Sequence, residues 1–242
     1  KLFENKWLSN YGLQPVAMTY SKKNENSISE PVEYNKNRLL SLIVLMLFTI
    51  PFWVCFEQAG SSLTLFAEYS TNRNFLGFEI PTGYFQSLNP LFIIVLAPLI
   101  SIFWNCLRNK DKEPTSVQKF SFALFLMAIA FCMLAFAGHL SESGKVSPLW
   151  LVGGYFIMTV AELCLSPIGL SLVSKLAPKN FLSLLMGCWF LTSFLGNLIA
   201  GFAGGQYESV STFQLFGVLA IVSLVSFALL QCLVPKLNKL IK

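Results

Sequence analysis

The fold of this chain is decided by residues Leu39–Phe66, which read LLSLIVLMLFTIPFWVCFEQAGSSLTLF. This stretch is longer than the roughly 20 apolar residues that cross the hydrocarbon core of a bilayer as a helix. It nevertheless contains Glu57, although an acidic residue at the centre of a membrane helix costs roughly 2.5–3.5 kcal/mol on insertion scales. Trp53 lies four residues before Glu57 and therefore shares a helix face with it. We interpret the stretch as a membrane helix with one face toward lipid and another toward a polar cavity.

The composition of the whole chain also indicates a helical membrane protein. Of its 242 residues, 55% are hydrophobic and only 12% are charged, whereas a soluble domain carries about 25% charged residues. Six apolar segments are each long enough to cross a bilayer, at residues 39–66, 85–104, 120–139, 149–174, 183–203 and 213–234. We therefore predict an all-α integral membrane fold, with a six-helix bundle over residues 39–242 and a cytoplasmic linker over residues 1–38.

The positive charges predict how the spans are oriented. Fifteen of the 17 Lys and Arg residues lie before the first span, after the last span, or in the second and fourth loops, and the other two lie in the first and third loops. Cytoplasmic segments carry such an excess, so we expect a multi-pass protein of the plasma (inner) membrane with both termini of this chain in the cytoplasm. Because the basic residues lie in loops, no nucleic-acid partner is expected. The chain does not begin with Met, and we expect it to be a piece of something longer.

Two carboxylates at membrane depth are the main candidates for chemistry. Glu162 lies in the fourth span, as Glu57 lies in the first, and it shares a helix face with Ser166. No Lys or Arg falls within any of the six spans, and an unpaired charge in the membrane marks a functional site by default. A ligand, a proton or another polypeptide must therefore balance these carboxylates, which suits either proton coupling or the binding of an ammonium group.

Other polar and aromatic residues lie on faces that could converge with the carboxylates. Asn89 lies in the second span, immediately before a proline that weakens the helix, and Trp189, Ser193 and Asn197 follow one another at intervals of four residues in the fifth span. For Asn89, Ser193, Asn197 and Ser166, an interhelical hydrogen bond and contact with a substrate are both open interpretations. Trp53 is too deep for an interfacial belt, and we interpret it as a cavity wall.

Small residues in the fifth span predict close helix packing. Gly196 with Ala200, and Gly201 with Gly205, form two small-xxx-small pairs. Proline at position 51 is expected to kink the first span because it removes a helical hydrogen bond.

Enzyme motifs are missing from the sequence. It has no HExxH, no Ser-His-Asp set and no paired carboxylates on one helix, and its six cysteines show no CxxC spacing. We therefore predict that the protein is not an enzyme and has no metal site or cofactor.

Four segments carry a more specific signal. They read FWVCFEQAGSSLTLFAE, GYFQSLNPLFIIVLAPL, ELCLSPIGLSLVSKLAP and SLLMGCWFLTSFLGN, in this order along the chain. Their order and spacing resemble the last six helices of the proton-dependent oligopeptide transporter family of the major facilitator superfamily. The resemblance implies the carboxy-terminal half of such a fold, with inverted three-helix repeats, a substrate site near the midplane and rocking of one half against the other.

The resemblance also implies roles for individual residues. Glu162 resembles the acid that receives the amino terminus of the peptide, and Asn89 resembles a contact to the peptide backbone. Glu57 resembles the family's proton-coupling glutamate, and the coupling ion would be H+. The predicted substrate-binding residues are Glu162, Asn89, Trp53, Trp189, Phe190, Ser193 and Ser166, and the predicted proton-coupling residues are Glu57 and Glu162.

The family's Glu-x-x-Glu-Arg motif and the basic residues for the peptide's carboxyl end are absent from this chain. Three hypotheses follow. The first is the carboxy-terminal half of a proton-coupled di- and tripeptide symporter, which needs an amino-terminal six-helix half on the same longer chain or on a separate polypeptide. The second is a non-transporting remnant or accessory membrane bundle. The third is a homodimeric carrier of another small solute.

Overall fold

The computed structural model describes residues 36–75, 77–178 and 181–241. The predicted linker over residues 1–38 lies almost wholly outside this range. Six segments are long and apolar enough to cross a membrane: Lys36–Tyr69, Gly83–Arg108, Ser116–Ser141, Leu149–Leu176, Leu182–Gly204 and Thr212–Ile241. The predicted fold of six membrane-spanning helices is confirmed.

The first two spans are each divided into shorter elements. The first contains α2 (Lys36–Phe56), the 3-10 helix η1 (Glu57–Gly60) and α3 (Ser62–Tyr69), and the second contains α4 (Gly83–Gln86) and α5 (Leu88–Arg108). An antiparallel hairpin of β1 (Asn74–Phe75) and β2 (Phe78–Glu79) lies between these spans. The remaining spans are α6 (Ser116–Ser141), α7 (Leu149–Leu176), α8 (Leu182–Gly204) and α9 (Thr212–Ile241).

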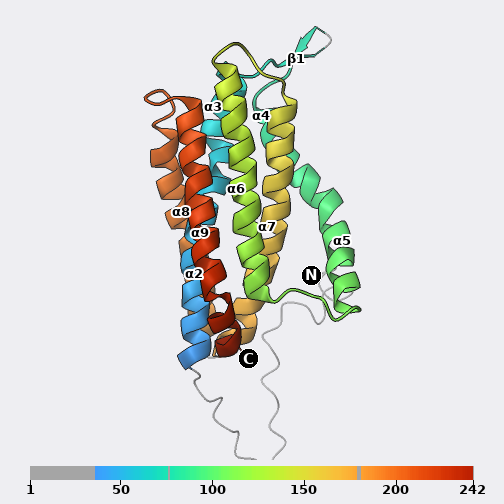
Figure 1. The fold of residues 1–242 in the computed structure, drawn as a ribbon, viewed down its shortest axis with the longest axis vertical. Coiled ribbons are helices and arrows are strands. Elements are labelled where there is room, and N and C mark those ends of the chain that lie inside the picture. Colours follow the sequence, from blue (N-terminus) through green and yellow to red (C-terminus); the bar gives the residue numbers. More distant parts are fainter. Residues whose placement is uncertain (1–35, 76, 179–180, 242) are drawn as a thin grey trace, which may run out of the picture. The chain divides into compact units, whose positions relative to one another are not determined.

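The helices differ greatly in how much of their surface is buried. α6 lies between α9 and α7, and α2 packs on α8 and α9 (Figure 1). α6 is apolar throughout residues 122–138, and a helix that is hydrophobic on all sides is suited to a buried position. α5 contacts chiefly α7, and none of its residues is buried. Most of the surface of α5 is therefore left uncovered by the other described helices.

The hairpin is fixed by Arg73, whose side chain is largely buried. Its guanidinium forms ion pairs with Glu68 and Glu79, both at 2.9 Å, and donates to the carbonyl of Ile80 at 2.9 Å. Glu68 itself is exposed, as expected for a residue just beyond the first span.

Candidate functional site

The first span is broken at the carboxylate that the sequence singles out. α2 ends at Phe56, η1 begins at Glu57, and α3 begins only at Ser62. α2 runs through Pro51, so the break lies one and a half turns beyond the position where the sequence predicts a kink. Irregular backbone at membrane depth is tolerated where it is buried in protein or lines a cavity, which makes this break a candidate site.

The buried side chain of Gln58 connects the pieces on either side of the break. Its Nε2 donates to the carbonyls of Val54 at 3.1 Å and Ala200 at 3.2 Å. Its Oε1 accepts from the hydroxyls of Ser61 at 3.1 Å and Ser62 at 2.6 Å. One side chain thus links the end of α2, the start of α3 and the last turns of α8.

A second set of hydrogen bonds satisfies a carbonyl inside the break. The carbonyl of Ala59 accepts from the hydroxyl of Tyr155 at 3.1 Å and from that of Thr64 at 3.0 Å. Carbonyl groups at a helix end have no partner within the helix and need another donor. Because Tyr155 belongs to α7, the bond also ties the break to the helix that carries Glu162.

Small residues of α8 let this helix approach the break closely. A Cβ added to Gly196 would lie 2.3 Å from the Cβ of Trp53, and one added to Gly204 would lie 2.8 Å from the Cβ of Ser61. The close contact predicted for Gly196 and Ala200 is confirmed. Gly201, which starts the other pair, is exposed and a Cβ there would meet nothing within 4 Å among the described residues, so its close contact with another helix stays a prediction.

The second span is also interrupted near its candidate residue. Asn89 lies in the first turn of α5, where the missing N–H of Pro90 disrupts no helical hydrogen bond. The Asn89 Nδ2 donates to Oε2 of Glu162 at 2.9 Å and to Oγ1 of Thr159 at 3.1 Å. The amide therefore joins α5 to α7 and orients the Glu162 carboxylate.

These elements enclose a cavity of about 240 Å³. It is lined by Phe56, Glu57, Ala59, Gly60, Gln86, Asn89, Tyr155 and Met158. Glu57 and Asn89 thus face the same space, and Glu162 adjoins it through its bond with Asn89. Asn197 of α8 lies near the Glu57 carboxylate. The structure thus brings together three predicted site residues, Glu57, Asn89 and Glu162, from three different spans.

The site carries negative charge without an internal counter-charge. In residues 36–241, leaving aside 76, 179 and 180, the ion pairs involve Glu68, Glu79, Glu113 and Glu142, and neither Glu57 nor Glu162 takes part in one. The charges of Glu57 and Glu162 are also close enough to interact with each other. An ionised pair of this kind at membrane depth is costly, so the geometry suits a site that receives a cation or a proton.

Two predicted residues near the carboxylates have unsatisfied polar groups. Ser166 lies one turn along α7 from Glu162, and its buried hydroxyl has no hydrogen-bond partner among the described residues. The indole Nε1 of Trp53 is likewise buried without an acceptor in that part of the chain. Each group therefore lacks the hydrogen-bond partner that a buried polar group normally has.

The predicted residues of α8 lie in different environments. Trp189 is only 3% exposed, packs edge-on to Phe120 and covers Gly169 of α7. Phe190 beside it is exposed, and Ser193 is half-buried. None of these α8 residues lines the 240 Å³ cavity, and their predicted role in side-chain pockets stays a prediction.

Some residues of the site were not singled out by the sequence. Thr159 accepts from Asn89, and Tyr155 lines the cavity. They lie three and seven residues before Glu162, which places all three on one helix face. Their helical spacing from Glu162 is the sequence pattern that could have predicted Thr159 and Tyr155 as site residues.

Comparison with known proteins identifies relatives of this chain. The family model described as PTR2, POT family, matches residues 5–231. The peptide transporter YePEPT of Yersinia enterocolitica is 44% identical over 178 residues, which are 72% of this chain and 35% of that protein. Dipeptide and tripeptide permease A of Proteus mirabilis is 35% identical over 167 residues, which are 69% of this chain and 34% of that protein.

A solved structure shares the arrangement of the helices. The crystal structure of a peptide transporter POT in complex with sulfate matches with a TM-score of 0.79 and 35% sequence identity, and the match covers 87% of this chain and 42% of that one. The chain therefore spans less than half the length of these relatives. It is a multi-pass membrane protein, and its relatives are named as transporters and not as enzymes.

Proposed function

The chain belongs to the POT family, and on this premise we propose that it is the carboxy-terminal half of a proton-coupled symporter of di- and tripeptides. The observation that carries the proposal is the meeting of Glu57, Asn89 and Glu162 at two helix interruptions around one cavity. The names of the Yersinia enterocolitica and Proteus mirabilis relatives support the substrate class.

In this proposal Glu162 receives the amino terminus of the peptide. Its carboxylate is partly buried, is oriented by the Asn89 amide and lacks a cation in the described part of the chain. Because Asn89 uses its Nδ2 for Glu162 and Thr159, its Oδ1 remains available to accept from an N–H of the peptide. The unpaired hydroxyl of Ser166 offers one further polar contact on the same face.

Glu57 carries or exchanges the coupled proton in this proposal. It lines the cavity from the irregular backbone of η1, whereas Tyr155 and Met158 line it from α7, and Asn197 lies near its carboxylate. A carboxylate at membrane depth is stable when it is protonated or faces a cation. When Glu57 releases its proton, its carboxylate would pair with a cation instead. This exchange would link the charge of the substrate site to the side of the membrane on which the site is open.

An amino-terminal six-helix half completes the transporter. The cavity of about 240 Å³ is smaller than the roughly 300–1,000 Å³ of most ligand pockets, and the side chains that would bind a peptide carboxylate are absent from it. The other half would supply the opposite wall and the cations, on the same longer chain or a separate one. Trp53, Trp189, Phe190 and Ser193 would form pockets for peptide side chains once the two halves meet.

Uptake of a labelled dipeptide into proteoliposomes tests the proposal. An inward proton gradient is applied to this chain alone and to this chain with the amino-terminal half of the Yersinia enterocolitica transporter. We expect uptake only in the pair, at least tenfold less with Glu162→Gln, and loss of gradient-driven accumulation but not of dipeptide exchange with Glu57→Gln.

The matched control is Glu142→Gln, because Glu142 is an exposed carboxylate outside the spans. Its uptake should equal that of the unmodified pair. A pair that is folded and associated, but takes up no dipeptide, would overturn the proposal and favour a non-transporting bundle.

A further inference from the structure

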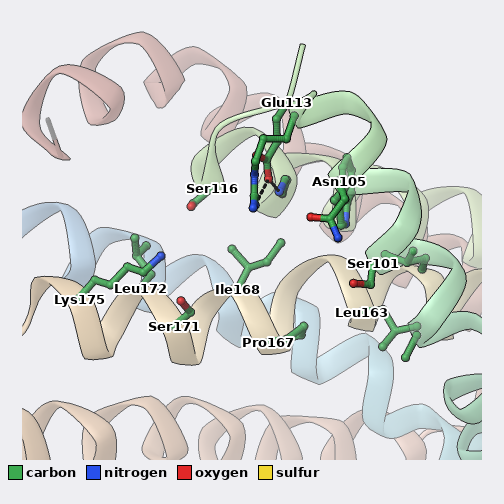
Figure 2. Close-up of a pocket in the computed structure, with 15 residues that line it drawn as sticks. Ser101, Asn105, Glu113, Ser116, Leu163, Pro167, Ile168, Ser171, Leu172 and Lys175 are labelled. Atoms are coloured by element: carbon green, nitrogen blue, oxygen red, sulfur yellow. Dashed lines mark hydrogen bonds and ion pairs between the residues drawn. The ribbon is translucent and has the colours of Figure 1, made fainter. Parts of the chain in front are cut away.

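A second cavity, of about 480 Å³, lies where α5 ends, α6 begins and α7 ends. This end of the bundle also contains the start of α2 and the end of α9 (Figure 1). Figure 2 shows α7 residues from Leu163 to Lys175 facing the residues of α5 and the following loop across the cavity. It shares no lining residue with the cavity at Glu57 and is a separate feature.

One end of this cavity carries surplus positive charge. Glu113 accepts from Nε of Arg108 at 2.6 Å and from Nζ of Lys119 at 2.6 Å. One carboxylate thus faces two cations, and Lys175 adds a third that forms no ion pair with any described residue. The residue charges sum to a net positive value at the mouth of the cavity.

Two side chains at this end are held in place but have hydrogen-bond donors without an acceptor among the described residues. The side chain of Lys119 is 9% exposed, lies over the ring of Trp104 at 4.4 Å, and bonds only to Glu113 among the described residues. An ammonium has three N–H donors, so further acceptors can bind. The indole Nε1 of Trp104, which also lines the cavity, is buried with no acceptor in the described ranges.

The other end of the cavity is apolar. Ile100 of α5 and Leu163, Pro167, Ile168 and Leu172 of α7 line it toward the middle of the spans. The cavity therefore has a cationic end at the limit of the helices and an apolar end at membrane depth. Basic pockets between membrane helices on the cytoplasmic side are suited to acidic lipid headgroups.

We propose that this cavity binds an anionic phospholipid, with its phosphate group at Arg108, Lys119 and Lys175 and an acyl chain along the apolar end. A phosphate group presents several acceptor oxygens to these donors. Free phosphate has the same chemistry at the cationic end but leaves the apolar end empty, which is why a lipid is the better fit. The site does not depend on the proposed transport function.

Native mass spectrometry of the purified chain in detergent tests this site. Phosphatidylglycerol is titrated against the chain, with phosphatidylcholine and inorganic phosphate in separate experiments. We expect phosphatidylglycerol to bind most tightly, and Lys175→Gln to weaken it roughly fivefold, as expected for one lysine near an anionic surface. Lys175→Glu should weaken it further. Lys175 is exposed and has no partner in the described ranges, so its replacement should leave folding intact.

The matched control is Lys239→Gln, which removes an exposed lysine from the last turn of α9 at the same end of the bundle. Its affinity for phosphatidylglycerol should equal that of the unmodified chain. Equal weakening by Lys175→Gln and Lys239→Gln would overturn the site, because it would show only general charge attraction. Inorganic phosphate that displaces the lipid at equal concentration, or loss of the lipid when the amino-terminal half is bound, would overturn the assignment to a lipid.

Discussion

Gln58 is the residue on which the break in the first span depends. Its four hydrogen bonds connect three helical segments within a fully buried environment. Gln58→Leu keeps a similar volume but leaves the hydroxyls of Ser61 and Ser62 without their acceptor. Leaving a buried polar group unsatisfied costs about 1–3 kcal/mol, so the variant should unfold at a lower temperature in detergent.

Gln206→Leu is the matched control for this change, since Gln206 is exposed after the end of α8 and its side chain makes no hydrogen bond with described residues. Its melting temperature should stay close to that of the unmodified chain. Equal melting temperatures for the two variants would contradict the role of Gln58. Dipeptide uptake by the pair of halves should also fall with Gln58→Leu, because η1 carries Glu57.

Glu113 supports a prediction about pH at the other cavity. Hydrogen bonds from Arg108 and then from Lys119 lower the pKa of the Glu113 carboxyl from its usual value to about 2. A pKa that is lower in the folded state means that the stabilisation is complete above pH 4.5 and is lost as the pH falls toward 2. Glu113→Gln should therefore lower the melting temperature at pH 6, and its difference from the unmodified chain should shrink at pH 3.

Glu142→Gln again provides the comparison, because Glu142 is an exposed carboxylate whose ion pair among the described residues is with His139, at 3.5 Å. Its melting temperature should follow that of the unmodified chain at both pH values. A Glu113→Gln difference that is as large at pH 2 as at pH 6 would show that lost packing, and not the ion pairs, explains the effect.

At the scale of elements, α8 depends on glycine where it meets the first span. Gly196→Ala would place a methyl group 2.3 Å from the Cβ of Trp53 and about 3 Å from its backbone. Backbone atoms cannot move aside as a flexible side chain can, so we expect a loss of about 1–3 kcal/mol in the free energy of unfolding. Chemical denaturation in mixed micelles, followed by circular dichroism, measures the change.

Gly187→Ala, in the same helix, is the internal control. Nothing lies within 4 Å of an added Cβ at this position. Alanine is favoured over glycine in a helix interior by about 0.5–1 kcal/mol, so this variant should be as stable as the unmodified chain or slightly more stable. Destabilisation of equal size in both variants would rule out close packing at Gly196 as the cause.

A comparison of the individual elements shows which features of the fold could be predicted from the sequence. Hydropathy predicted all six spans because each depends on its own residues, and the cost of burying Glu57 and Glu162 made them stand out without any knowledge of the fold. The break at Glu57 could not be predicted in this way. It is held by hydrogen bonds to Ala200 and from Tyr155, which are about 140 and 100 residues away in sequence.

The same contrast between local sequence pattern and tertiary packing applies to the residues of the site. Asn89 and Glu162 were predicted individually, but their hydrogen bond depends on how α5 and α7 pack. The environment of Trp189 was not visible in the sequence, since it depends on the absence of a side chain at Gly169 in another helix. The local sequence pattern thus identified residues that are costly to place in a membrane, and tertiary packing determined which of them contact one another.

At the scale of the whole molecule, the charge distribution predicts that both termini of this chain are cytoplasmic. Asn109, after α5, and Lys145, before α7, are exposed residues at opposite ends of α6. Asn109→Cys and Lys145→Cys can each be made in a chain whose six cysteines are replaced by serine, and probed in intact cells with a membrane-impermeant maleimide. Because positive loops stay inside, Lys145→Cys should react in intact cells and Asn109→Cys only after the membrane is permeabilised. The reverse pattern would invert the orientation, and it would place the cavity lined by Arg108, Lys119 and Lys175 at the outer leaflet.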